Sequence, residues 1–217
     1  MAKGTSFGTI HSDRILHLIQ QKVEVQPAEP KTKYVDIPGG NGSKDLTEAL
    51  GIGVKFKDRT ISWTFALYPK DDWYSKQKEV SGLLNGLACR ITLDGDPLYY
   101  YEGRLSVGSH KSNNQLRQIT VKAVCRPYKL KKNATVVNYA LNSEYKTILL
   151  LNSRMPVAPE ITVNTATDIK FNGNVYRLSE GTNKILDIQL SEGANILEAK
   201  TGNGPGNISF LYREGAL

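Results

Sequence analysis

Apolar and polar residues alternate along several stretches of the chain with a period of two, which is typical of half-buried β-strands. The two clearest runs lie at 60–68 and 117–125. Their apolar positions are Ile61, Trp63, Phe65 and Leu67 in the first run and Ile119, Val121, Ala123 and Cys125 in the second. We expect 98–107 and 117–125 to pair as a hairpin through a polar, turn-rich loop at 108–114.

One stretch has the spacing of an amphipathic helix instead. Asp71 and Asp72 are suited to cap its start, and Gly86 lies near its end. The apolar residues at helical spacing are Trp73, Val80, Leu83, Leu84 and Leu87. This pattern predicts a helix packed on a sheet, with the tryptophan in the core. A second segment, 13–20, fits the period of either a helix or a strand.

The composition changes near 127–133, where a proline and a basic, polar segment follow the alternating run. Beyond it, short apolar segments are separated by glycine- and asparagine-rich turns. These segments are 147–151, 160–164, 169–171, 175–178, 185–190, 196–199 and 208–212. Such spacing indicates a β-sandwich. We therefore expect a mainly β protein with one helix, divided into an α+β domain at 1–128 and a sandwich at 129–217.

Charge and hydropathy narrow the range of partners. The chain has 217 residues and a net charge of +7, but its basic excess is diffuse. The tightest cluster consists of Arg126, Lys129, Lys131 and Lys132. Because no nucleic-acid-binding module accompanies this cluster, we interpret it as a solvated linker. The longest apolar run, 148–151, is far too short to span a bilayer. We expect no specific nucleic acid and no membrane among its partners.

Residues with reactive or metal-binding side chains are few and scattered. Cys89 and Cys125 are not spaced as a metal or redox motif, and a disulfide between them stays open. His11, His17 and His110 have no cluster of carboxylates or thiols at ligand spacing, so we expect surface or lightly buried histidines.

Catalytic pairs are also missing from the pattern. Ser109 and His110 are adjacent, which is the wrong relationship for a nucleophile and its base. Asp94 and Asp96 resemble a turn more than the carboxylate pair of a glycosidase. We therefore expect no enzyme activity, no catalytic or metal-binding residues and no cofactor.

The segment 36–42 has a distinctive order of residues, but it contains no nucleophile, no metal-binding cluster and no phosphate-loop lysine. Pro38, Gly39, Gly40 and Gly42 predict a turn in preference to a ligand loop, because a phosphate loop needs a lysine and a following helix. Asp45 follows this segment and Arg59 begins the strand at 60–68. The two side chains are candidates for an exposed structural ion pair or for contacts with a neighbouring subunit.

Three consecutive tyrosines follow a turn at 94–97. Because alternate side chains of a strand point to opposite faces, only Tyr99 and Tyr101 can share a surface. Tyrosine suits both a core and a protein interface, and both roles stay open here.

The order of these segments resembles the distal tail proteins of long-tailed bacteriophages with non-contractile tails, over nearly the whole chain. The segments that carry the resemblance are Ser6-Phe7-Gly8, Val35-Asp36-Ile37-Pro38-Gly39, Asp45-Leu46-Thr47, Phe56 with Arg59-Thr60-Ile61, Tyr99-Tyr100-Tyr101-Glu102-Gly103-Arg104, Pro159-Glu160-Ile161-Thr162-Val163, Ile188-Gln189-Leu190, Glu192-Gly193-Ala194-Asn195 and Tyr212-Arg213-Glu214-Gly215-Ala216-Leu217. Each is weak by itself, and their joint order makes the match specific.

The resemblance implies an N-terminal β-barrel or sandwich domain that forms a hexameric ring, followed by a galectin-like sandwich. It implies a structural hub at the virion tail tip, made in the cytoplasm of the bacterial host. Its partners would be other copies of itself, the tail tube protein, and tail-tip and receptor-binding proteins. The candidate structural or interface residues are Pro38, Gly39, Gly40, Gly42, Asp45, Arg59, Tyr99 and Tyr101. Charge reversal at Arg59 is expected to weaken ring assembly more than folding.

A carbohydrate-binding module for host adhesion is the alternative function. Trp63 and Trp73 would be its only stacking platforms, yet both fall on apolar faces that predict core positions. The segment 129–217 contains no tryptophan and no histidine, so it lacks the residue types of a galectin sugar site. We therefore expect no glycan binding by the galectin route.

Overall fold

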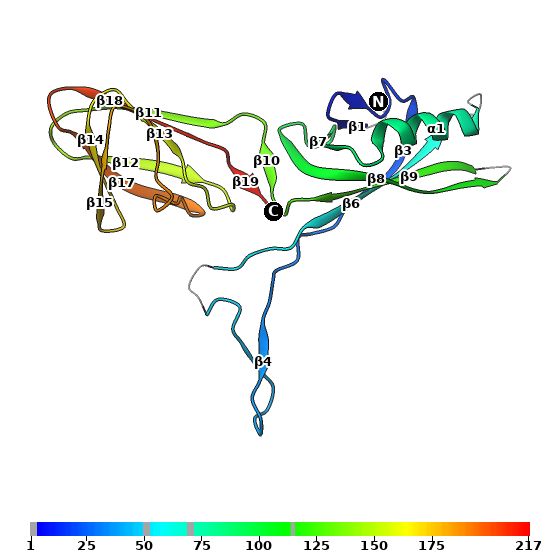
Figure 1. Cartoon of the computed structure of the whole chain (residues 1–217), viewed down its shortest axis with the longest axis horizontal. Coiled ribbons are helices and arrows are strands. Elements are labelled where there is room, and N and C mark those ends of the chain that lie inside the picture. Colours follow the sequence, from blue (N-terminus) through cyan, green and yellow to red (C-terminus); the bar gives the residue numbers. More distant parts are fainter. Residues whose placement is uncertain (1–3, 50–52, 69–71, 114–115) are drawn as a thin grey trace. The chain divides into compact units, whose positions relative to one another are not determined.

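The computed structural model describes residues 4–49, 53–68, 72–113 and 116–217. Within these residues the chain is mostly β with one α-helix, which confirms the predicted fold class. The chain divides into two compact units, Met1–Lys129 and Leu130–Leu217. This division falls one residue after the predicted boundary between 1–128 and 129–217. Figure 1 shows the elements of both units.

Unit 1 is built around one antiparallel sheet and one helix. Its elements are β1 (Thr5–Phe7), β2 (Ile10–His11), β3 (Leu18–Val25), β4 (Tyr34–Asp36), β5 (Ser43–Asp45), β6 (Arg59–Leu67), α1 (Trp73–Leu84), β7 (Ala88–Leu93), β8 (Tyr99–Asn113) and β9 (Leu116–Cys125). Seven strands pair in the order β2-β1-β7-β8-β9-β6-β3, and β4 pairs with β5 separately. Among the described strands this path of seven begins at β2 and ends at β3. One face needs no second sheet because α1 covers it (Figure 1).

The core of unit 1 follows from the alternation along β6. Residues of β6 are alternately buried and half-buried over its whole length, as the sequence predicts. Trp63 is fully buried, and its ring meets Phe7 edge-on at 5.1 Å between centroids. The Trp63 indole N–H donates to the Thr5 hydroxyl at 3.0 Å, so the buried ring keeps a polar partner.

Helix α1 confirms the predicted helix and its signals. The Asp72 carboxylate accepts from the Ser75 backbone N–H at 2.9 Å, which caps the first turn. Gly86, with φ of 82°, follows the last turn in a left-handed conformation. Asp71 lies outside the described residues. Leu83 was expected on the buried face, but it is exposed, because the helix turns only Trp73, Val80 and Leu84 into the core.

The hairpin of β8 and β9 confirms the predicted pairing but not the predicted loop. Strand β8 continues through most of 108–114 as far as Asn113, and residue 114 lies outside the described residues. The register shifts between Val107 and His110, so a bulge absorbs one extra residue of β8 without ending the ladder. The polarity of this segment was misleading, because backbone pairing between strands does not require apolar side chains.

The segment 13–20 forms neither alternative over its full length. The His11 carbonyl accepts from the backbone N–H groups of Ile15 and Leu16, which makes a short turn. Strand β3 then begins at Leu18. A single turn between two strands gave the mixed periodicity.

Unit 2 contains two four-stranded antiparallel sheets. Following β10 (Lys129–Lys131), which spans the boundary, its strands are β11 (Thr135–Leu141), β12 (Lys146–Asn152), β13 (Glu160–Val163), β14 (Thr167–Phe171), β15 (Asn174–Leu178), β16 (Gly181–Lys184), β17 (Gly193–Thr201), β18 (Gly206–Tyr212) and β19 (Gly215–Ala216). The sheets have the orders β11-β18-β13-β16 and β12-β17-β14-β15. Their inward residues form one core, including Ile148, Ile161 and Phe210, so unit 2 is a β-sandwich as predicted.

One predicted strand of unit 2 is wrong, and the predicted segments did not include β10, β11, β16 and β19. The segment 185–190 contains a turn, in which Ile188 donates its backbone N–H to Ile185, and only an isolated bridge between Val157 and Leu190. The strand lies just before it, at β16. Buried apolar side chains at 185–190 imitate a strand because they fill the sandwich from a loop. Strand β11 was not expected at all.

Glu214 joins three segments at one end of unit 2. Its side chain is 12% exposed and forms a 2.6 Å ion pair with Lys131. It also accepts from the hydroxyl groups of Thr135 at 2.7 Å and Ser153 at 2.6 Å. Burial by itself raises the pKa of Glu214, but these hydrogen bonds and the Lys131 charge outweigh it and lower the pKa below its usual value. The ionised form is therefore the one that the fold stabilises.

A glycine separates the two cysteines of unit 1. Cys89 and Cys125 lie on neighbouring strands on either side of Gly103. A Cβ atom at Gly103 would come within 2.5 Å of the Cys125 Sγ and 2.6 Å of the Val124 carbonyl oxygen. The close approach of β9 thus requires glycine at this position.

Glu214→Gln is expected to lower the free energy of unfolding of unit 2 at pH 7 by about 1–3 kcal/mol, because it removes a charged acceptor. The lowered pKa of Glu214 gives stability that is present above the pKa of the unfolded chain and is lost as pH falls through the folded pKa. The difference between wild type and variant should therefore shrink on acidification below about pH 4. Calorimetry would follow unit 2, while tryptophan fluorescence reports only unit 1. An equal difference at pH 7 and pH 3 contradicts the role of the charge.

Gly103→Ala is expected to destabilise unit 1 by about 1–3 kcal/mol, because the added methyl group must displace β9. The matched control is Gly82→Ala in α1, where a Cβ meets open space. Helix propensity predicts a gain of roughly 0.5–1 kcal/mol for the control. Urea unfolding followed by tryptophan fluorescence would measure both. Equal stabilities of the two variants would refute the close-packing argument.

Candidate functional site

The hairpin of β4 and β5 is the most exposed structure of unit 1. We call residues 34–45 the arm hairpin; Figure 1 shows it as a separate two-stranded ribbon. Every residue from 29 to 45 is exposed. Two chain segments connect the hairpin to the sheet, and within the described residues they pair at Pro30 and Phe56. It thus contributes nothing to the core of its own unit.

The tip of the arm hairpin is a turn, as the sequence predicts. The Ile37 carbonyl accepts from the Gly40 N–H at 2.9 Å. Gly39 and Gly42 have φ angles of 78° and 75°, which side-chain-bearing residues rarely adopt. The Ser43 hydroxyl donates to the Asp36 carboxylate at 2.6 Å and closes the turn. Pro38 is exposed within it.

Apolar side chains cover the arm hairpin although no part of unit 1 buries them. Tyr34 is 60%, Val35 40% and Ile37 54% exposed. Three large apolar residues within four positions, on a ribbon too small to form a core, are costly in water. Such a surface is typical of a site that another protein covers.

The expected pair between Asp45 and Arg59 does not form within the described part of the chain. Asp45 is exposed on the arm hairpin, and its carboxylate accepts from the Thr47 N–H at 2.8 Å. Hydrogen bonding by Thr47 lowers the pKa of Asp45. Arg59 is 5% exposed at the start of β6. The alternation of β6 turns Arg59 to the same face as Trp63, and this burial is why the two charges stay apart.

Arg59 carries a buried charge with little compensation. Its Nε and Nη2 atoms have no hydrogen-bond partner among the described residues. The guanidinium lies 5.6 Å from the centre of the Tyr101 ring, and Cys125 is its neighbour on β9. This burial gives a reason to expect that charge reversal here also acts on folding, and its effect on assembly stays a prediction.

The three tyrosines each lie beside a cation. Tyr99 faces Lys129 at 4.6 Å, and Lys129 also forms a 2.8 Å ion pair with Asp96. Tyr100 and Tyr101 are both buried in unit 1. Burial raises the pKa of the Tyr101 hydroxyl. Tyr101 is therefore a core residue, and of the pair Tyr99 and Tyr101 only Tyr99 keeps a partly open surface.

His11 was expected at the surface or lightly buried, and the structure places it against a carboxylate with 8% of the residue exposed. Its Nε2 atom lies 3.3 Å from the Asp94 Oδ2 atom, while its Nδ1 atom accepts from the backbone N–H groups of Asp13 and Arg14. A Cβ on Gly4 would meet the His11 ring at 2.5 Å, so the ring is held tightly. His11 and Asp94 are far apart in the sequence, so no local pattern predicted their contact. The contact holds two segments of the fold together.

The remaining chemistry-bearing side chains form no site in the described residues. His17 is exposed in a turn, and the side chains of Ser109 and His110 lie outside the described part. Asp96 closes the turn after Leu93 as predicted. The described residues include no cluster of three or more histidine, cysteine or acidic groups placed to hold a metal ion. No described helix has the length and hydrophobicity that crossing a bilayer needs.

The basic segment after β9 is more ordered than a solvated linker. Lys129 pairs with Asp96, and Lys131 pairs with Glu214. Arg126 lies 3.3 Å from Glu102. The three charges are used to hold the chain at the end of unit 1 and the start of unit 2. Because these three charges are paired, they do not form a free phosphate-binding surface.

The cysteines and tryptophans belong to the core of unit 1. Both cysteines are free thiols, and burial raises the pKa of Cys125 to about 12. Trp63 is 0% and Trp73 7% exposed. Neither tryptophan can stack on a sugar, so the platform expected for a carbohydrate-binding module is absent from the described surface.

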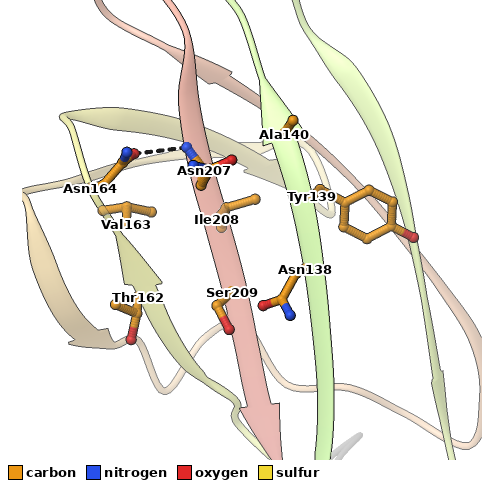
Figure 2. A pocket seen from close by; sticks show the side chains of 9 residues that line it. All are labelled: Asn138, Tyr139, Ala140, Thr162, Val163, Asn164, Asn207, Ile208 and Ser209. Carbon is orange, nitrogen blue, oxygen red and sulfur yellow. Dashed lines mark hydrogen bonds between the residues drawn. The ribbon is translucent and has the colours of Figure 1, made fainter.

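A groove crosses the outer face of one sheet of unit 2, and no pattern along the sequence predicted it. We call it the polar groove; it has a volume of about 380 Å³. Its lining residues are Asn138, Tyr139, Ala140, Thr162, Val163, Asn164, Asn207, Ile208 and Ser209. Figure 2 shows Asn138, Ser209 and Thr162 side by side on β11, β18 and β13. The lining contains no charged residue.

The chain has the fold of a phage distal tail protein, as the predicted resemblance required. One solved structure that it matches is SPP1 Dit (gp 19.1), described as a paradigm of the hub adsorption apparatus in phages that infect Gram-positive bacteria. The match covers 98% of this chain and 99% of that chain, with a TM-score of 0.66 and 14% sequence identity. No protein-family model and no curated protein matches the sequence.

Arg59→Glu is expected to lower the free energy of unfolding of unit 1 by about 3–5 kcal/mol, because it buries a carboxylate without a cation. Arg59→Met keeps the packing and removes the charge, so it should change stability by less than about 1 kcal/mol. Lys122→Glu, at an exposed position of β9, is the matched charge reversal. Urea unfolding followed by tryptophan fluorescence distinguishes them. Wild-type stability for Arg59→Glu would contradict this effect on folding.

Proposed function

We propose that this protein is a structural hub of a phage tail tip, which assembles as a hexameric ring between the tail tube and the tail-tip or host-adhesion proteins. The observation that carries the proposal is the likeness to SPP1 Dit over nearly the whole length of both chains. A match of one domain would fit many functions, whereas a match of two successive domains fits few.

The arm hairpin supports self-assembly. A closed ring needs two different, complementary surfaces on each subunit, so that every copy both gives and receives the same contact. A protruding apolar ribbon with Tyr34 and Ile37 exposed is suited to be the giving surface. Its glycine-rich tip at 39–42 fixes the direction of the ribbon, which is the role we assign to Gly39, Gly40 and Gly42.

The remaining features fit a protein that works by shape. The described polar clusters, His11 with Asp94 and Glu214 with Lys131, hold segments of the fold together. We propose a non-enzymatic role, without cofactor or metal. The proposal includes a galectin-like unit 2 that faces other tail proteins, assembly in the bacterial host cytoplasm and a final location at the virion tail tip.

Ile37→Asp is expected to reduce ring assembly strongly and to leave the stability of both units within about 0.5 kcal/mol, because the side chain is exposed in the subunit. Light scattering gives the assembled mass, and negative-stain microscopy gives the symmetry. Leu186→Asp is the matched control, since Leu186 is 74% exposed on unit 2. Six-fold rings for the wild type and the control, with smaller species for Ile37→Asp, are the expected result.

Two results would count against parts of this proposal. A wild type that stays monomeric at all concentrations, alone and with tail tube protein, contradicts the ring. Rings of unchanged mass for Ile37→Asp contradict the arm hairpin as a subunit contact, while the ring itself stands.

A further inference from the structure

A shallow trough crosses the outer face of the sheet of unit 1, over β7, β8 and β9. It has a volume of about 460 Å³. We call it the arginine trough, and two rows of side chains line it. These side chains are Arg90, Glu102 and Arg126 in one row and Ala88, Arg104 and Val124 in the other. Val124 is 56% exposed, so the trough also offers apolar surface.

The arginine trough carries more positive than negative charge. Glu102 lies 3.6 Å from Arg90 and 3.3 Å from Arg126, so one carboxylate is shared between two cations. Arg104 is held by a backbone carbonyl group, which is neutral. Asp58 is the second carboxylate of the lining, which leaves three cations against two anions.

Arg90 and Arg104 are positioned to bind a pair of carboxylates. The Arg90 guanidinium lies over the ring of Tyr100 at 4.8 Å. The Arg104 guanidinium donates to the Gly86 carbonyl at 2.6 Å. A guanidinium has five N–H donors, so both groups keep donors for a further acceptor. Because Arg90 faces Glu102 and Arg104 lies two residues further along β8, the two arginines are diagonal neighbours, roughly 7–8 Å apart.

One side of the arm hairpin presents a matching pair of carboxylates. In the register of β4 and β5, Tyr34 faces Asp45. Asp36 faces Ser43 in the same way. Residues that face each other share one side of a ribbon, so both aspartates lie on the side of Tyr34, while Lys44 lies on the opposite side. Asp36 and Asp45 are diagonal neighbours, roughly 7–8 Å apart, which is the spacing of the two arginines.

From this match we propose that the arm hairpin of one copy docks in the arginine trough of the next copy, with Asp36 and Asp45 against Arg90 and Arg104. The proposal rests on the ring of the proposed function and names the surface that receives the arm. Guanidinium and carboxylate groups form paired hydrogen bonds, which fix orientation as well as adding energy. Docking also relieves the repulsion between like charges that each surface carries by itself.

The two surfaces agree in size and in apolar content. Strands β4 and β5 pair over three residues, a length of roughly 10 Å. The trough crosses three strands, a width that is also roughly 10 Å. Tyr34 is 60% and Val124 56% exposed, so contact between them adds hydrophobic burial to the ion pairs. Because the arm and the trough are different surfaces, every copy can both give and receive, as closure of a ring requires.

Unit 2 carries a second diagonal pair of cations, which serves as the matched control. Lys170 faces Glu198, and Lys200 lies two residues further along β17. Both ammonium groups lie against the ring of Tyr145, at 3.7 and 4.8 Å. An ammonium group lacks the planar fork that binds a carboxylate through two hydrogen bonds. The lysine pair therefore has the spacing of the arginine pair without its geometry.

The test measures assembly of the full chain by sedimentation velocity. The arm variant carries Asp36→Arg and Asp45→Arg, and the trough variant carries Arg90→Glu and Arg104→Glu. In each variant alone like charges meet, so the concentration needed for half-assembly should rise at least about ten-fold. In an equimolar mixture the two variants can alternate, and opposite charges then meet at every contact. The mixture should therefore assemble at a concentration within a few-fold of that of the wild type.

Controls separate assembly from folding. Lys170→Glu combined with Lys200→Glu should assemble as the wild type does. Urea unfolding followed by tryptophan fluorescence shows whether unit 1 of each variant keeps the stability of the wild type. If the trough variant unfolds more readily, Arg90→Gln combined with Arg104→Gln takes its place and should weaken assembly several-fold.

Several results would overturn the docking proposal. One is normal assembly of the folded arm variant, or of the trough variant or its glutamine counterpart. Another is a mixture of folded arm and trough variants that stays unassembled. A third is loss of assembly with the lysine pair but not with the arginine pair, which would place the receiving surface on unit 2. In all three cases the wild type still assembles, so the ring stands. A wild type that never assembles contradicts the ring and the docking together.

Discussion

An antiparallel sheet that is buried on one face is the constraint on which both units depend. In unit 1 the alternation of β6 turns Trp63 and its neighbours toward a single face, and α1 closes that face. In unit 2 two sheets close on each other in the same way. The opposite faces must be polar enough to meet water or shaped to meet a partner. The polar groove and the arm hairpin both lie on surfaces that this burial leaves exposed.

Local periodicity made most of the fold predictable. Strand β6, helix α1 and the sandwich strands follow from alternation, capping and glycine positions that neighbouring residues carry by themselves. The wrong predictions have a common cause. In these segments the pattern of polar and apolar side chains does not follow the hydrogen-bond pairing of the backbone. At 108–113 polar residues continue a ladder, and at 185–190 apolar residues fill a core from a loop. At 13–20 one turn between strands mixed two periods.

The candidate sites were predictable to different degrees for the same reason. The glycines at 39, 40 and 42 predict the turn of the arm hairpin. No sequence pattern predicts that the hairpin lies away from the core. Arg59 looked like a surface charge because most arginines are, and only its register on β6 shows that it is buried. The polar groove joins residues near 138, 162 and 208, and no short window of sequence contains that relationship. The likeness in whole-chain order to distal tail proteins was the one long-range signal available.

Gly103 also decides the covalent chemistry of unit 1. Because it separates Cys89 from Cys125 by two strand spacings, their Cα atoms are roughly 9–10 Å apart, beyond the reach of about 7 Å that a disulfide allows. An oxidising environment therefore cannot join the two thiols while the sheet is intact. Unit 1 therefore keeps the same covalent form in reducing and in oxidising surroundings.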